Sequence, residues 1–188
     1  MTTSEDKRAL RASLLSRKMR LGKDEVDKMS EAAIKKLIGF LDWAKVRNIH
    51  IYIPITANNE LNTWPFIKHL RDNFPNVMIY LPKLDGFAKL DSYAEVRENR
   101  LGIPEPITKT LTSGVQFDVI IIPTIGFDRR GYRLGYGAGY YDRFLAKHRS
   151  KNVIGLSYAM SEIDKVPDEP HDKKMHTVIT EKEIISVS

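Results

Sequence analysis

The sequence contains no cysteine among its 188 residues. The absence of cysteine excludes disulfide bridges, thiolate metal sites and a thiol nucleophile, and it is typical of a reducing compartment. No apolar run approaches the roughly 18 residues that a membrane helix needs. The first residues are polar and charged, without the apolar region of a signal peptide. We therefore expect a cytoplasmic protein that has no membrane partner.

The sequence also lacks the patterns of nucleic-acid-binding proteins. It has no zinc-finger spacing, no RNA-recognition signature and no tract in which aromatic and basic residues interleave. Its formal net charge is +6, which favours anionic partners. We therefore expect a small polyanion such as ATP as a partner, and no nucleic acid.

The overall composition is that of an ordinary soluble globular protein, with 42% hydrophobic and 29% charged residues. A chain of this length can bury a sizeable core within one domain. No internal repeat, low-complexity tract or linker divides it. We expect a single domain over residues 1–188 that acts as a monomer.

Hydrophobic periodicity predicts strands that alternate with helices. Strands are expected over residues 48–53, 77–81, 118–123, 153–158, 177–180 and 184–187. Helices are expected up to about residue 20 and over 24–41, 63–73 and 140–147. Pro82 is expected to end the second strand, residues 86–98 to hold a weaker strand pair, and residues 99–116 to form a long loop over the site. The alternation predicts an α/β fold, a Rossmann-like three-layer arrangement with a mainly parallel sheet flanked by helices.

A glycine-rich segment, residues 126–139, holds five of the eleven glycines. It lies between a predicted strand and a predicted helix, an arrangement that brings backbone N–H groups to phosphate. Neither common fingerprint fits, because Tyr132 and Arg133 stand where a P-loop needs Lys and Ser or Thr, and Tyr140 stands where a dinucleotide loop needs glycine. The same stretch is rich in charge, with Arg129, Arg130, Arg133, Asp142 and Arg143. This mixture suits an anion with a divalent cation, and a flexible surface turn is the alternative.

The first predicted helix is strongly basic, since residues 7–23 hold seven basic residues and no acid. Lys7, Arg11 and Lys18 fall on one side of it. An apolar seam lies beside them, formed by Leu10, Leu14 and Leu21. The helix therefore either packs on the domain with cations at the edge of its packed face, or presents a solvated basic face.

Other polar residues have two interpretations each. Asp142 is either a magnesium ligand or a carboxylate that satisfies N–H groups at a helix start. Glu60 is either a ligand-binding residue or the cap of the next helix. His171, Asp172 and His176 lack the spacing of a helical metal pair, so Asp172 is expected to serve magnesium rather than a transition metal.

The run RLGYGAGYYDRFL, preceded by GFDRRGY, resembles the signature of the 5-formyltetrahydrofolate cyclo-ligases, also called methenyltetrahydrofolate synthetases. The resemblance spans most of the chain, including KRALR at residues 7–11, the loop before Glu60, GIPEP at 102–106 and PHD at 170–172. It implies a ligase that uses ATP and Mg²⁺ to convert 5-formyltetrahydrofolate to 5,10-methenyltetrahydrofolate, releasing ADP and phosphate.

The resemblance also implies roles for individual residues. The catalytic cations would be Lys7, Arg11 and Arg133. ATP would be bound by Lys7, Arg8, Ala9, Leu10, Arg11, Arg133, Leu134, Gly135, Tyr136, Gly137, Ala138, Gly139, Tyr140 and Tyr141. The folate would contact Ile55, Glu60, Tyr136, Gly137, Ala138, Gly139 and Tyr140, and Mg²⁺ would be held by Asp142 and Asp172. The chain departs from the family pattern at Ala138, where members often carry Gly or Lys, and at His176, where bacterial members often carry Asp.

The residue types suit this chemistry, because a phosphoryl transfer needs fixed cations, backbone donors and a metal rather than a protein nucleophile. For Tyr140 and Tyr141 we expect one ring to face the core and the other to line the pocket. Two other functions stay open from the residues alone. One is a basic module that binds nucleic acid or phosphate without catalysis, and the other is a sugar-phosphate enzyme that does not use ATP.

Overall fold

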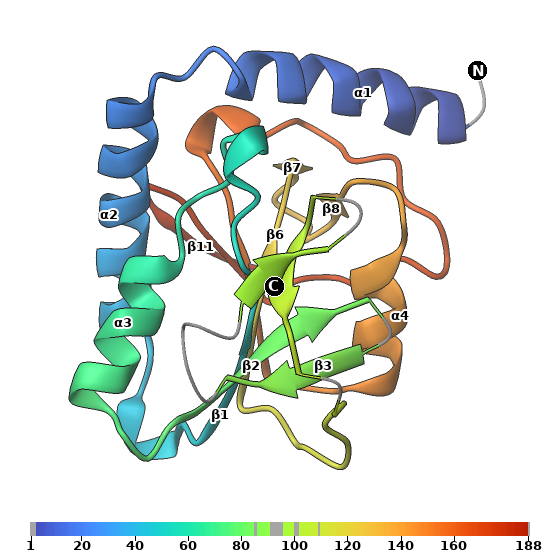
Figure 1. Cartoon of the computed structure of the whole chain (residues 1–188). Helices are drawn as coiled ribbons and strands as arrows, with labels where there is room; N and C mark the ends of the chain where they lie inside the picture. The colour runs from blue at the N-terminus through green and yellow to red at the C-terminus, as the bar shows by residue number, and fades with distance from the viewer. Residues whose placement is uncertain (1–2, 85, 91–95, 100–101, 109, 188) are drawn as a thin grey trace.

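A seven-stranded sheet forms the centre of the fold in a computed structural model, which describes residues 3–84, 86–90, 96–99, 102–108 and 110–187 (Figure 1). The strand order is β11-β10-β9-β6-β1-β2-β3. The strands are β1 (Asn48–Ile51), β2 (Met78–Lys83), β3 (Gly86–Lys89), β6 (Val119–Pro123), β9 (Asn152–Leu156), β10 (Thr177–Ile179) and β11 (Ile184–Ser186). The five inner strands run parallel, and the edge strands β3 and β11 are antiparallel to their neighbours.

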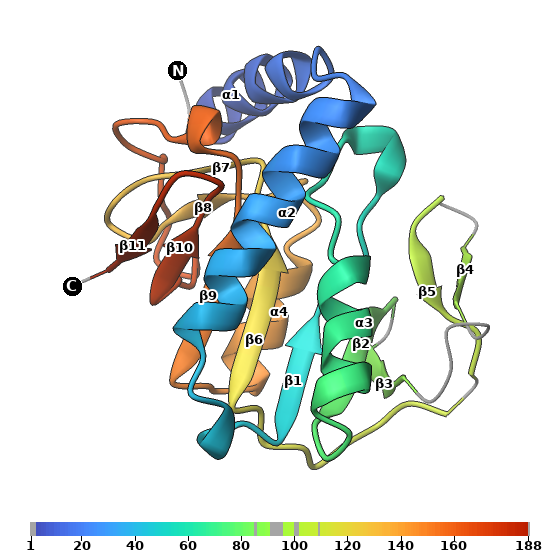
Figure 2. The same cartoon turned by 90° about the vertical axis from the view of Figure 1, so that its left-hand side faces the viewer.

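Helices cover both faces of this sheet. They are α1 (Thr3–Lys18), α2 (Lys23–Phe40), α3 (Trp64–Asn73) and α4 (Tyr140–Lys147). Figure 2 shows α2 and α3 on one face, α4 behind the other, and α1 across the end to which the arrows of β1 and β6 point. The predicted three-layer α/β fold with a mainly parallel sheet is therefore confirmed. None of the described helices is long and apolar enough to span a membrane.

Two hydrophobic clusters fill the space between the layers. In β1, Ile49 and Ile51 point toward α2 and α3, where Leu37 and Phe66 are fully buried. His50 points to the opposite face because side chains alternate along a strand. There it lies in an aromatic cluster that includes Phe87, Phe117 and Phe144. Both faces of the sheet are therefore buried against apolar side chains, as is usual for a parallel sheet.

The sheet topology reverses between β1 and β6. From β1 the chain moves to β2 on one side, whereas from β6 it moves to β9 and β10 on the other. In parallel α/β sheets, ligands bind outside the carboxyl ends of the strands at such a reversal. Tyr52 follows β1 at this point, Thr124 follows β6, and Ser157 follows β9. The region under α1 is therefore where the fold itself predicts a ligand.

Helix α1 lies directly on the glycine-rich segment. Leu14 forms a third buried cluster with Ile125 and Leu134. A Cβ atom at Gly126 would lie 2.5 Å from Leu14 Cδ1, so a side chain there would push the helix away. The segment continues as a short antiparallel ribbon of β7 (Gly126–Phe127) and β8 (Arg133–Leu134).

Three local predictions were wrong. Strand β2 continues through Pro82, because the pairing of β1 with β2 stops at Tyr80 and the missing N–H of proline breaks no bond there. Residues 86–98 are not a strand pair: β3 pairs with β2, and β4 (Val96–Glu98) pairs with β5 (Pro104–Pro106). The expected long loop over residues 99–116 therefore contains a strand. Residues 91–95 of the predicted pair lie outside the described residues.

Candidate active site

The basic helix α1 and the glycine-rich segment meet through Arg11. Its Nε donates a hydrogen bond of 2.7 Å to the carbonyl oxygen of Gly135. Gly137 has φ of +99°, and a Cβ atom there would lie 3.4 Å from the guanidinium carbon of Arg11. Two segments that sequence reasoning assigned to the same anion, residues 7–11 and 133–141, thus lie side by side.

Lys7 is buried, with 8% of the residue exposed. Its ammonium lies 2.7 Å from Asp172 Oδ2 and 2.9 Å from Glu169 Oε2. Burial opposes the charge on Lys7, but hydrogen bonds to Asp172 and Glu169 outweigh it, so the pKa of Lys7 is raised. Burial likewise opposes the charge on Asp172, yet the hydrogen bond from Lys7 leaves the pKa of Asp172 lowered. Lys7 and Asp172 therefore both stay charged and form a pair of opposite charges.

The interpretation of α1 as a packed helix with cations at the edge of its packed face is confirmed. Lys7 and Lys18 are buried and Arg11 is partly buried, whereas Arg8 and Arg17 are exposed. A solvated basic face is therefore the wrong description of the first three.

Arg133 and Asp142 form the second pair of opposite charges. Arg133 Nη2 lies 2.7 Å from Asp142 Oδ1, and only 5% of the Arg133 side chain is exposed. Asp142 Oδ1 also accepts a hydrogen bond of 3.1 Å from the backbone N–H of Lys173. The residue that caps α4 is Gly139, so Asp142 contacts another segment instead of capping its own helix.

A cluster of possible metal ligands directly precedes Lys173, whose backbone contacts both members of this pair. One ligand atom from each of Glu169, His171 and Asp172 falls within 4.8 Å of the others. Carboxylate oxygens are the ligands that Mg²⁺ prefers, so Asp142 and Asp172 fit the predicted metal by chemistry. The set of His171, Asp172 and His176 does not assemble, because His176 Nδ1 accepts a hydrogen bond from the N–H of Val153 in β9.

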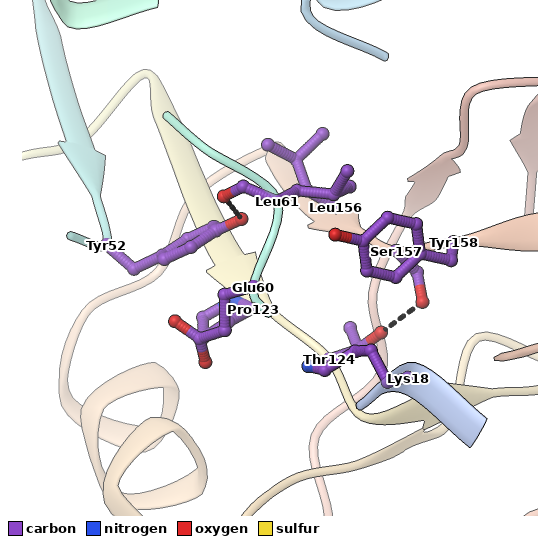
Figure 3. A pocket seen from close by; sticks show the side chains of 9 residues that line it. All are labelled: Lys18, Tyr52, Glu60, Leu61, Pro123, Thr124, Leu156, Ser157 and Tyr158. Carbon is purple, nitrogen blue, oxygen red and sulfur yellow. Dashed lines mark hydrogen bonds between the residues drawn. The ribbon is translucent and has the colours of Figure 1, made fainter. Parts of the chain in front are cut away.

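A small cavity of about 10 Å³ lies under α1 at the carboxyl ends of the strands (Figure 3). It has room for about one water molecule. Its walls are Lys18, Tyr52, Glu60, Leu61, Pro123, Thr124, Leu156, Ser157 and Tyr158. These residues come from α1, from the loop after β1 and from the ends of β6 and β9, so the cavity marks the reversal of the sheet topology.

Glu60 projects into this cavity and is 5% exposed. Its Oε2 accepts a hydrogen bond of 2.7 Å from the N–H of Ile55. Thr63 is the N-cap of α3, so the interpretation of Glu60 as the cap is wrong. Burial raises the pKa of Glu60, and the Ile55 N–H, the Tyr136 hydroxyl and the charge of Lys18 oppose this rise.

Tyr136 links the glycine-rich segment to the loop of Glu60. Its hydroxyl interacts with Glu60 and Asn58, while 40% of the residue remains exposed. Burial and the neighbouring charge of Glu60 raise the pKa of Tyr136, so the hydroxyl stays a hydrogen-bond donor. The predicted ATP loop and the predicted folate loop therefore touch.

The two tyrosines that begin α4 have different surroundings. The Tyr141 hydroxyl is buried without a partner among the described residues, and its ring centre lies 5.9 Å from that of His50. The Tyr140 hydroxyl instead donates a hydrogen bond of 2.6 Å to the carbonyl oxygen of Gly86. That one of the two rings lines the substrate pocket stays a prediction. Ala138 is exposed, and its carbonyl oxygen accepts a hydrogen bond from Arg143.

Sequence reasoning missed two residues that the fold places here. Glu169 shares the Lys7 ammonium with Asp172, and the acidic run before His171 was the only signal for it. Lys18 lines the cavity beside Glu60, although the sequence placed it only on the same helix side as Lys7 and Arg11.

Residues 3–181 match the model of the 5-formyltetrahydrofolate cyclo-ligase family. The chain belongs to this family. The assignment from the run RLGYGAGYYDRFL is therefore confirmed, as is the prediction of an enzyme of the cyclo-ligase class.

Named relatives agree with this assignment. The 5-formyltetrahydrofolate cyclo-ligase of Mycoplasma pneumoniae is 29% identical over 94% of this chain and 99% of its own. The protein of the same name from Escherichia coli is 26% identical over 89% of this chain and 96% of its own. Among solved structures, the 5,10-methenyltetrahydrofolate synthetase of Aquifex aeolicus superposes with a TM-score of 0.83 at 27% identity, covering 96% of this chain and 92% of its own.

Proposed function

We propose that the protein uses ATP and Mg²⁺ to convert 5-formyltetrahydrofolate to 5,10-methenyltetrahydrofolate, with release of ADP and phosphate. Membership of the cyclo-ligase family supports the reaction. The observation that carries the nucleotide site is the contact of Arg11 with Gly135, which joins the basic helix to the glycine-rich segment. That junction supplies fixed cations and backbone groups together, as binding of a polyphosphate requires.

The proposed chemistry activates a poor electrophile. The formyl oxygen attacks the terminal phosphorus of ATP, and ADP departs. The second folate nitrogen then adds to the formyl carbon and loses its proton, and the carbon–oxygen bond breaks. Phosphate leaves with the former formyl oxygen, and the five-membered ring is closed. No protein nucleophile takes part, so the protein contributes position and charge.

Three cations are assigned to the phosphates: Lys7, Arg11 and Arg133. Lys7 and Arg133 are held by carboxylates that are themselves the proposed metal ligands, Asp172 and Asp142. Each ion pair therefore keeps a cation and a carboxylate ready at one place. Lys7, Arg11 and Arg133 would face the phosphate oxygens, and Asp172 and Asp142 would hold the metal.

Magnesium, when bound by Asp142 and Asp172, would supply positive charge that offsets the charge of the transferring phosphoryl group. The Arg133 side chain is held in place, because it is buried and also donates a hydrogen bond of 2.5 Å to the carbonyl oxygen of Lys173. Arg133 would therefore lie within reach of the same phosphates. The acidic oxygens alone would repel a nucleotide, so these cations are needed beside them.

We assign the folate to the side of the glycine-rich segment that faces away from the proposed phosphate site. Glu60 and Ile55 lie in the loop after β1, and Tyr136 to Tyr140 belong to the segment itself. The contact between Tyr136 and Glu60 supports a common boundary for the two substrates. A folate on one side of this boundary and ATP on the other would bring the formyl oxygen toward the terminal phosphate.

The experiment that tests this proposal mixes the purified protein with 5-formyltetrahydrofolate, ATP and Mg²⁺. The near-ultraviolet absorption band of the methenyl product should appear, and ADP should accumulate in equal amount. Omission of ATP or chelation of Mg²⁺ should abolish both. ATP consumption without methenyl product, or no reaction with all components present, would refute the proposed function.

A further inference from the structure

Lys18 is the most deeply buried lysine side chain at the site. Only 1% of the residue is exposed, and it lies in the last turn of α1. None of the hydrogen bonds and ion pairs within the described part of the chain involves its ammonium. Burial lowers the pKa of Lys18, and the charge of Glu60 is the only influence that opposes this. The ammonium is therefore desolvated but not neutralised by a direct partner.

The position of Lys18 is fixed by its backbone. Asn59 Nδ2 donates hydrogen bonds to the carbonyl oxygens of Lys18 and Leu21, at 3.1 and 3.0 Å. Asn59 directly precedes Glu60, so the end of α1 is tied to the loop that carries this carboxylate. Figure 3 shows Lys18 entering the cavity from α1 beside Thr124, on the side where the Glu60 carboxylate lies.

A buried amine without an acceptor costs free energy, and a native fold rarely keeps one unless a partner arrives. Glu60 does not provide that partner, because the two groups influence each other without forming an ion pair. Both face one cavity at the reversal of the sheet topology. A donor and a double acceptor therefore point into the place where this fold binds ligands.

We propose that Lys18 is a further substrate-contacting residue, and that Lys18 and Glu60 together bind the 2-amino-4-oxopyrimidine edge of the folate. This inference rests on the proposed function. That edge presents a carbonyl oxygen at position 4 followed by two donors, the ring N–H and the 2-amino group. Lys18 donates to the carbonyl oxygen, and the two oxygens of Glu60 accept from the two donors. The order donor, acceptor, acceptor in the protein matches the order acceptor, donor, donor in the ring.

The ring needs more room than the cavity of about 10 Å³ offers. Movement of Tyr136 would provide this room. Its hydroxyl is hydrogen-bonded to Glu60, and 40% of the residue is exposed. Its neighbours Gly135 and Gly137 leave the backbone free to turn. The ring therefore replaces the Tyr136 hydroxyl at Glu60 and brings the 4-oxo group to Lys18.

The test compares two ligands that differ at position 4. Dissociation constants are measured by calorimetric titration for 5-formyltetrahydrofolate and for its 4-amino analogue, which presents a donor to Lys18 instead of an acceptor. The dissociation constant of the 4-amino analogue is divided by that of 5-formyltetrahydrofolate, and this ratio is compared between the wild type and Lys18→Met, which keeps most of the length of the side chain. Lys18→Met loses a hydrogen bond from a charged group to the 4-oxo oxygen, so this ratio should fall at least about tenfold. Lys18→Gln keeps a polar end, so its ratio should lie between those of the wild type and Lys18→Met. It serves as the second variant if Lys18→Met does not fold.

Arg17→Met is the matched control, because Arg17 precedes Lys18 on the same helix and is exposed. Its ratio should equal that of the wild type. Folded Lys18 variants that weaken both ligands equally, with the ratio unchanged, would overturn the inference and leave Lys18 a structural residue. In that case turnover by the wild type would still support the proposed function. A wild type that binds neither ligand would overturn both.

Discussion

Lys7 Nζ lies 2.7 Å from Asp172 Oδ2, a contact that joins two residues 165 positions apart in the sequence. It fastens the N-terminal half of α1 to the segment after β9. It also places a proposed phosphate-binding cation against a proposed metal ligand. Nucleotide and metal are therefore expected to use a pair of charges that already exists in the free protein.

Lys7→Met should weaken the use of ATP more than the use of folate. The substitution removes a buried ammonium that we assign to phosphate, whereas the folate cavity has different walls. Loss of one charge-assisted contact is expected to cost about 1.5–3 kcal/mol, or at least a tenfold rise in the Michaelis constant for ATP. Steady-state kinetics with each substrate varied in turn measure the effect. Arg20→Met, an exposed change just after the end of the same helix, is the control. Equal behaviour of the two variants would exclude the assignment.

The stability that Lys7 contributes should depend on pH in a defined way. The pKa of Asp172 is lowered, so its contribution is present above the ordinary value of 3.8 and is lost as the pH falls through the folded-state value. The pKa of Lys7 is raised, so its contribution is present below 10.5 and is lost as the pH rises through the folded-state value. Urea unfolding should therefore find Lys7→Met about 1–3 kcal/mol less stable than the wild type at neutral pH.

The difference between the two proteins should shrink both below pH 3.8 and above pH 10.5. A difference that stays unchanged below pH 3.8 and above pH 10.5 would mean that Lys7 stabilises the fold by packing of its carbon chain alone.

Asp142→Asn should preserve the fold and impair catalysis. The amide oxygen can still accept hydrogen bonds from Arg133 and from the N–H of Lys173, so the melting temperature should change little. The loss of an anionic ligand should weaken the hold on Mg²⁺, and turnover should fall at least about tenfold, equivalent to about 1.4 kcal/mol. Raising the magnesium concentration should restore part of the activity. Asp164→Asn is the control, because Asp164 is an exposed carboxylate in the loop after β9. Normal turnover and an unaltered magnesium dependence in Asp142→Asn would remove Asp142 from the metal site.

Gly126→Ala should destabilise the protein by pressing on α1. The new Cβ would lie 2.5 Å from Leu14 Cδ1, and Leu14 is only 3% exposed, so it has little room to move. We expect a loss of about 1–3 kcal/mol in the free energy of unfolding. In a Leu14→Ala background the same change should cost less by at least about 0.5 kcal/mol, because the two positions are coupled.

Gly39→Ala serves as the control for that experiment. Gly39 lies near the end of α2, and no heavy atom of the described residues would come within 4 Å of its Cβ. An alanine there should stabilise the protein by up to about 1 kcal/mol, since glycine is a poor helix former. Equal effects of the two glycine substitutions would contradict the close packing of α1 on the glycine-rich segment.

Local patterns were sufficient to predict most of the secondary structure. The β-branched run after Asp118 became β6, and the helix from Tyr140 to Lys147 became α4 with the expected bounds. Pro82 was misjudged because its tolerance depends on where the pairing with β1 ends, which is not a local property.

Long-range contacts decide what the sequence could not predict about the site. His50 has polar nitrogens but is fully buried among aromatic rings, and burial lowers its pKa to about 3. Lys18 and Glu169 gain their surroundings only when α1 crosses the ends of the strands. In contrast, Arg133 and Asp142 belong to one recognisable run, so their proximity was expected from the sequence.

The most direct test of the proposed reaction follows the formyl oxygen. The protein is supplied with ATP, Mg²⁺ and 5-formyltetrahydrofolate that carries oxygen-18 in the formyl group, and the released phosphate is examined by mass spectrometry. Transfer of the phosphoryl group to the formyl oxygen requires one heavy oxygen in each phosphate that accompanies a methenyl product. Unlabelled phosphate formed in equal amount with the methenyl product would contradict phosphorylation of the formyl oxygen.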